Sequence, residues 1–170
     1  MTRIIAVDPG LASTAVVAMT QSEVVATWTF TTPGGGHKVD FANAIERAES
    51  IASRIAALGA ELGAIDAVVV ETYVDIPGAL RGVANRWTTP LCIGLLIPAL
   101  RSIAPGGVIH WQSAETVMRE SRTLRDMWAA GARAKRDTLL AGDRMLTNAH
   151  TRSAAAHGLF YAKMHEEGTR

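Results

Sequence analysis

Apolar residues recur along this chain in two rhythms, and each rhythm predicts one type of element. Short apolar runs predict strands at residues 3–8, 13–19, 23–31, 65–71 and 108–111. Apolar residues at three- and four-residue spacing predict a helix over about residues 40–62, which Asp40 can begin and Gly63 can end. Further helices are expected at about 79–102, from Ser113 onward, at 136–146 and at 150–166.

The order of these elements predicts an α/β fold. Three strands come first, followed by helix, strand, helix, strand and further helices, which indicates a mixed sheet with helices packed on it. The breaks at Pro9-Gly10 and at residues 20–22 favour antiparallel hairpins between the first three strands. Pro90 and Pro98 are expected to start, kink or break the helix at 79–102.

Length and composition favour a single folded domain and argue against several other classes of protein. A length of 170 residues favours one domain over 1–170, and a hydrophobic content of 48% argues against disorder. Cys92 is the one cysteine, so an intrachain disulfide framework is excluded and a cytoplasmic setting is expected. No signal peptide is expected, and the apolar run at 91–100 is too short to span a bilayer and contains Pro98.

Charge is unevenly distributed along the chain. Residues 1–100 hold 6 basic and 9 acidic residues, whereas residues 101–170 hold 11 basic and 7 acidic residues. This asymmetry indicates a polyanionic partner, although a solvated helix face explains it equally well. The basic residues cluster further at Arg119, Arg122, Arg125, Arg133, Lys135 and Arg136.

Two of the predicted strands end in a carboxylate. The apolar run 4–7 leads into Asp8 and a Pro-Gly turn, and the apolar run 67–70 leads into Glu71. A carboxylate rarely belongs in a core unless it is paired or bound to a metal, although Asp8 could also serve only as a turn acid. Two divalent ions held by carboxylates can stabilise the attacking and leaving oxygens of phosphodiester hydrolysis, and Mg²⁺ needs few protein ligands.

Further candidate ligands lie near the C-terminus. On a helix, His150 and Ser153 share one face, because they are three residues apart, and His157 lies near that face. The alanines after Ser153 would let this helix pack close to the sheet.

These three segments together resemble the RuvC-type Holliday junction resolvases. The resemblance rests on Asp8-Pro9-Gly10 after an apolar strand, on the strand that ends in Glu71, and on residues 150–155, which look like the family's C-terminal motif. It implies an RNase H-like fold with three antiparallel strands followed by parallel strands. It also implies a homodimer that uses Mg²⁺ or Mn²⁺ to cleave four-way junctions, with flaps and forks as further branched substrates.

The resemblance also implies roles for individual residues. Asp8, Glu71 and His150 fall on the metal-binding and catalytic positions, and Ser153 falls where the family usually has an aspartate. Serine is a weaker ligand for a hard cation, so Ser153 could act through water, or His157 or Asp143 could compensate. The expected DNA contacts are Arg122, Arg133, Lys135, Arg136 and Tyr73, the last of which could stack on an unpaired base or pack at the strand end.

Two other functions compete with junction cleavage. Ser153 favours a protein that binds branched DNA with weak cleavage or none. A strand that ends in an aspartate-glycine turn also occurs in sugar kinases and actin-like ATPases, but 170 residues are too few for their two-lobed architecture and no second phosphate loop is present.

Overall fold

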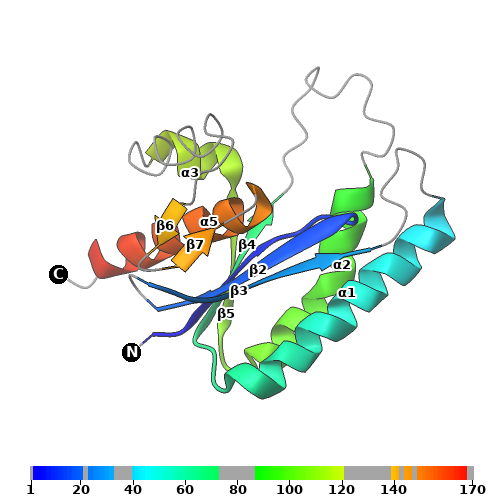
Figure 1. Ribbon diagram of the computed structural model, residues 1–170, viewed down its shortest axis with the longest axis horizontal. Helices are drawn as coiled ribbons and strands as arrows, with labels where there is room; N and C mark the ends of the chain where they lie inside the picture. The colour runs from blue at the N-terminus through cyan, green and yellow to red at the C-terminus, as the bar shows by residue number, and fades with distance from the viewer. Residues whose placement is uncertain are drawn as a thin grey trace.

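Five strands form a mixed sheet in the order β3-β2-β1-β4-β5 (Figure 1). The computed structural model describes residues 2–20, 23–32, 40–72, 87–120, 139–141, 144–146 and 149–167. The strands of the sheet span Ile4–Asp8 (β1), Ser13–Met19 (β2), Val24–Thr31 (β3), Ala67–Thr72 (β4) and Val108–Ser113 (β5). The strands predicted from the sequence are therefore confirmed, with β5 two residues longer than expected.

Strand direction changes at the middle of the sheet. Strand β2 is antiparallel to both β1 and β3, as the predicted hairpins require. Strands β1, β4 and β5 are parallel, so β4 returns to the sheet by a crossover through a helix. The carboxyl ends of β1 and β4 therefore meet at the same edge of the sheet.

In the ranges that the structure describes, four helices accompany the sheet: α1 (Phe41–Leu62), α2 (Thr88–Ile103), α3 (Ala114–Glu120) and α5 (Ala149–Glu167). The predicted caps of α1 are confirmed. Asp40 Oδ1 accepts a hydrogen bond of 2.8 Å from the Asn43 backbone N–H, and Gly63 ends the helix with a φ of 72°.

Helix α2 is shorter than the predicted helix in the part that the structure describes, because residues 79–86 lie outside it. Pro90 lies in the first turn of α2, where its missing N–H is not needed. Pro98 lies inside the helix and does not end it.

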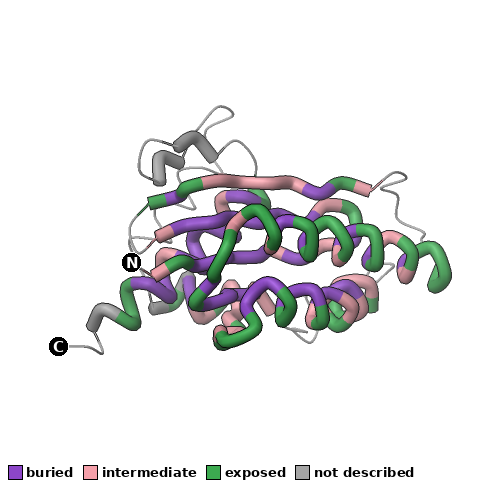
Figure 2. The backbone as a smooth tube through the Cα atoms, turned by 90° about the horizontal axis from the view of Figure 1, so that it is seen from below, coloured by how far each residue is buried: buried purple, intermediate pink, exposed green. Residues whose placement is uncertain are grey.

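The sheet separates two apolar layers, because side chains alternate between its faces. On one face, Ile5 and Val7 of β1 pack with α1 and α2. On the other face, Ile4 and Ala6 pack with α5. Figure 1 shows α1 and α2 together on one side of the sheet and α5 on the other. The central strands β1, β2 and β4 are mostly buried between them, and Figure 2 shows buried backbone in this layer.

Small residues bring α5 close to the sheet. Ala154 and Ala155 are fully buried against it. A methyl group added at Gly158 would overlap Met19 Sδ and would lie 3.1 Å from Ala6 Cβ. This close approach is what carries the polar side chains of α5 to the ends of β1 and β4.

The predicted helix at 136–146 is wrong. Leu139–Ala141 (β6) and Arg144–Leu146 (β7) instead pair as antiparallel strands. Each strand is only three residues long, and the two are separated in the sequence by Gly142-Asp143, a dipeptide typical of hairpins. Helical periodicity and strand runs cannot be told apart over such short segments. Among the described residues, no helix is both long and apolar enough to cross a membrane.

Candidate active site

Asp8 and Glu71 lie at the ends of neighbouring parallel strands. The register pairs Val7 with Val70, so each acid is the next residue along its own strand. Both side chains are partly exposed, with 15% of Asp8 and 21% of Glu71 accessible. The structure therefore brings together the two acids that the sequence predicts as a pair.

The turn after Asp8 is held by hydroxyl groups. Thr14 Oγ1 donates to the Gly10 carbonyl at 2.8 Å and accepts from the Gly10 N–H at 3.2 Å. Thr32 Oγ1 donates to the Leu11 carbonyl at 2.7 Å. A Cβ at Gly10 would lie 2.7 Å from the Ser13 carbonyl oxygen, so the tight turn requires glycine there. These contacts hold the turn that directly follows Asp8.

Helix α5 contributes one polar side chain to each acid. His150 Nδ1 lies 2.9 Å from Asp8 Oδ2, and Ser153 Oγ donates to Glu71 Oε2 at 2.7 Å. His150 is half exposed, whereas Ser153 is buried. The helical face that the sequence predicts for His150 and Ser153 is confirmed, and it lies against the two acids.

A second imidazole approaches Glu71 from within the protein. His157 is fully buried, its Nε2 lies 3.6 Å from Glu71 Oε2, and its Nδ1 lies 3.1 Å from Gln112 Oε1. Sequence reasoning named His157 only as a compensating group, and it missed Gln112 and Thr14. Gln112 lies one residue beyond the predicted fifth strand, and that neighbouring position was the only signal for it. The observed β5 continues to Ser113 and pairs Gln112 with Glu71.

The electrostatics of the site reflect two acids that are close together and partly desolvated. Burial, and next the negative charge of Asp8, raise the pKa of Glu71 from 4.5 to about 7. The hydrogen bond to Asp8 raises the pKa of His150 above 6.5, against the effect of burial. Burial lowers the pKa of His157 to about 4, so this ring is neutral at pH 7.

The donor atoms suit one class of ligand, a hard divalent cation. Burial and, next, repulsion from Asp8 raise the pKa of Glu71, and a cation near the two acids would relieve that repulsion. Mg²⁺ needs only one or two carboxylates, because water and substrate phosphate complete its shell. Within the described residues, no group of three or more His, Cys, Asp or Glu side chains is arranged as a metal site. His150 and Ser153 are instead hydrogen-bonded to the two acids. The fit therefore rests on the carboxylate pair.

The predicted DNA contacts cannot be placed beside this site. Arg122, Arg133, Lys135, Arg136 and Tyr73 lie outside the described residues, as does Asp143.

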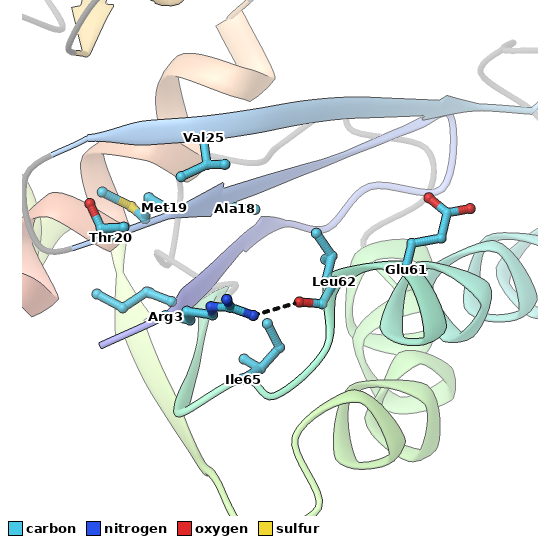
Figure 3. Close-up of a pocket in the computed structure, with 9 residues that line it drawn as sticks. Arg3, Ala18, Met19, Thr20, Val25, Glu61, Leu62 and Ile65 are labelled. Carbon is cyan, nitrogen blue, oxygen red and sulfur yellow. Dashed lines mark hydrogen bonds between the residues drawn. The ribbon is translucent and has the colours of Figure 1, made fainter. Parts of the chain in front are cut away.

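A cavity of about 570 Å³ lies at the other end of the sheet (Figure 3). Its wall includes Arg3 and Ile4 at the start of β1, and Arg3 Nη1 donates to the Leu62 carbonyl at 2.9 Å. Asp8 lies at the opposite end of the same strand. The cavity and the acid pair are therefore separate features.

The fold, unlike the sequence, matches known proteins. No protein-family model and no curated protein matches the chain. The structure of Thermus thermophilus RuvC in complex with Holliday junction substrate matches with a TM-score of 0.72 at 15% identity, covering 99% of this chain and 98% of that one. A second T. thermophilus RuvC structure matches with a TM-score of 0.69 at 14% identity and the same coverage. The resemblance inferred from the three motifs is thus confirmed for the fold: this chain has a RuvC-type, RNase H-like fold.

Proposed function

We propose that this protein is a metal-dependent endonuclease that cleaves Holliday junctions and other branched DNA by phosphodiester hydrolysis. The observation that carries the proposal is the meeting of Asp8 and Glu71 with His150 and Ser153 on a RuvC-type fold. Residues 1–170 would act as one nuclease domain. The matched RuvC bound to a Holliday junction supports branched DNA as the substrate class.

Asp8 and Glu71 would hold the divalent cations, Mg²⁺ or Mn²⁺. When bound, such cations stabilise the charge that develops on the attacking and leaving oxygens. Ser153 donates to Glu71 Oε2 and so restrains the orientation of that carboxylate. The buried residues that precede both acids exclude water from beneath the pair, and a phosphate would approach from the side on which the two carboxylates are partly exposed.

His150 is the residue best placed to move a proton. Its Nδ1 faces Asp8 Oδ2, which fixes the ring and leaves Nε2 to exchange a proton with water or with the leaving oxygen. The hydrogen bond to Asp8 raises the pKa of His150, so the His150 ring is protonated in a larger fraction of molecules near neutral pH. Half of its side chain is exposed, at 49%, so solvent and substrate can reach it.

Two copies of the chain would act on one junction, as the resemblance implies, because a four-way junction offers two strands for cutting. Arg122, Arg133, Lys135 and Arg136 would bind phosphates, and Tyr73 would stack on an unpaired base. These assignments rest on the sequence alone.

A cleavage assay tests the proposal. Wild-type protein and Asp8→Asn would be incubated with a synthetic four-way junction, a flap, a fork and linear duplex in Mg²⁺ or Mn²⁺. We expect the wild-type protein to nick the branched substrates, and we expect Asp8→Asn to bind the junction without cutting it. If both proteins leave every substrate uncut in both metals, the proposed cleavage is wrong.

Binding of branched DNA with weak cleavage or none is the second candidate function. It is favoured by the hydrogen bond from Ser153 to Glu71, because a neutral donor stands where the family usually has an acid. Selective junction binding without nicking in either metal would support this function over cleavage.

A further inference from the structure

Two side chains of α5 approach one oxygen of Glu71, and a side chain of β5 contacts one of them. Ser153 of α5 donates to Oε2 at 2.7 Å, and His157, one turn later on the same helix, places Nε2 at 3.6 Å from that atom. Gln112 of β5 lies on the other side of the imidazole, 3.1 Å from Nδ1. The parallel register pairs Gln112 with Glu71 directly, so β5 and α5 hold the ring between them.

The His157 ring lies between Gln112 and Glu71 and, unlike a surface histidine, is enclosed by the protein. His157 is fully buried among the residues that join α5 to the sheet. A neutral imidazole has one N–H donor and one acceptor nitrogen. The amide of Gln112 can turn either its oxygen or its NH₂ group toward Nδ1, so the ring can direct its single N–H toward the carboxylate.

Nothing about phosphodiester chemistry requires a buried imidazole at this depth. Because its side chain is inaccessible, His157 cannot reach substrate, and its contacts run to Glu71 and Gln112 instead. Groups that orient a metal-binding side chain typically change metal affinity or activity by about 10–100-fold when they are removed.

We infer that His157 and Gln112 are positioning residues that fix the Glu71 carboxylate for binding a divalent cation, which compensates for the serine at position 153. This inference rests on the proposed role of Glu71 in holding the cation. His157 does not act on DNA, and its effect is transmitted only through Glu71.

The affinity for a divalent cation is the quantity to measure, because it would not change if His157 and Gln112 served only in packing. Mn²⁺ would be titrated into the full chain by calorimetry, for the wild-type protein, Asp8→Asn, His157→Leu, His157→Gln and Gln112→Leu. Thermal unfolding without metal would be recorded for each variant. Tyr161→Phe is the matched control, because Tyr161 lies four residues after His157 on α5, is buried, and packs on His110 of β5 with ring centroids 4.4 Å apart.

We expect His157→Leu to bind Mn²⁺ about 10–100-fold more weakly, and Tyr161→Phe to keep the wild-type affinity. His157→Gln should recover affinity, because its amide can donate to Glu71 from nearly the same place. Gln112→Leu should weaken binding in the same direction, and its effect should not add to that of His157→Leu, because both act through one side chain.

Three results would overturn the inference: wild-type affinity in His157→Leu, an equal loss in Tyr161→Phe, or wild-type binding that does not depend on Asp8. If His157→Leu does not fold, wild-type affinity in Gln112→Leu overturns it. If the wild-type protein cuts junctions while His157→Leu keeps the wild-type affinity for Mn²⁺, the proposed function stands and this inference is wrong. If the wild-type protein leaves junctions uncut while His157→Leu binds Mn²⁺ more weakly, the cleavage function is wrong and this inference stands.

Discussion

His150 Nδ1 lies 2.9 Å from Asp8 Oδ2, although the two residues are 142 positions apart in the chain. The contact exists because α5 packs on the face of the sheet formed by Ile4 and Ala6 of β1. Docking of α5 and formation of the site are therefore one event. Anything that moves α5 away from the sheet should also separate His150 from Asp8.

The pair of His150 and Asp8 should contribute stability that depends on pH. The hydrogen bond raises the pKa of His150 above 6.5, so the folded protein holds this proton more tightly than the unfolded chain. The contribution is fully present below 6.5 and is lost as the pH rises through the raised pKa. Because His150 is half exposed, we expect it to be less than about 1 kcal/mol.

Urea unfolding of the wild-type protein and His150→Gln across this pH range measures that contribution. The difference between the two free energies of unfolding should be largest at acidic pH and should shrink toward pH values well above neutrality. A difference that does not vary with pH would contradict the ion pair.

Glu71 should change stability with pH in the same direction as His150, over a lower pH range. Burial raises its pKa from 4.5 to about 7, so stability falls as the pH rises through this window, in which the folded protein binds the proton more tightly. Without metal, Glu71→Gln should therefore match the wild-type protein in acid and exceed its free energy of unfolding by about 3 kcal/mol above the window.

Denaturation curves in the presence of a chelator test this expectation. Glu61→Gln is the control, because Glu61 is an exposed acid on α1, far from the paired strand ends. Equal behaviour of Glu71→Gln and Glu61→Gln at every pH would count against a desolvated Glu71.

Ser153 offers a test of both candidate functions. Ser153→Ala removes the donor to Glu71 Oε2 and should lower the free energy of unfolding by about 1 kcal/mol. Ser153→Asp adds a third acid, which should lower stability without metal and raise both Mn²⁺ affinity and junction cleavage. If Ser153→Asp cuts junctions no faster than the wild-type protein, the serine is not what limits cleavage. The comparison needs nicking rates and calorimetric affinities from the same preparations.

Alanine substitutions at two glycines distinguish a loss of stability from a change in the geometry of the site. A methyl group at Gly158 meets Met19 and Ala6, and one at Gly59 lies 3.1 Å from Ile103 Cβ. Both alanine substitutions should lower stability by about 1–3 kcal/mol, partly offset by the better helix propensity of alanine. Only Gly158→Ala should also weaken Mn²⁺ binding, because Gly59 lies between α1 and α2 on the far face. Equal affinities in the two variants would mean that the site tolerates movement of α5.

The predicted DNA contacts at Lys135 and Arg136 can be tested through the salt dependence of junction binding. Replacing Lys135 and Arg136 with glutamine should weaken junction binding and reduce the slope of log affinity against log salt by about one per lost phosphate contact. Arg54→Gln is the control, because Arg54 lies on α1 over the ring of Phe30, on the opposite face of the sheet from α5. An unchanged slope in the double variant would exclude these two residues as phosphate contacts.

Local signals were enough to predict most of the fold. The alternation and apolar runs of β1 to β4 predict those strands within two residues of their observed bounds, because burial on both faces of a sheet leaves a direct mark on the sequence. The caps of α1 could also be predicted, since Asp40 and Gly63 act within one turn of the helix. The segment 136–146 could not, because two runs of three residues carry no decisive period and strand pairing selects between the alternatives.

The amino-acid sequence alone was enough to predict Asp8, Glu71, His150 and Ser153 as a set. Local pattern indicates the strand ends and the helical face on which they lie, and the combination of the three segments resembles one family. The sequence could not show which atoms meet. The approach of His157 to Glu71, and of Gln112 to His157, depends on the register of β5 and on how closely α5 packs. Such contacts are decided by burial and packing between segments far apart in the chain, which no local run of residues encodes.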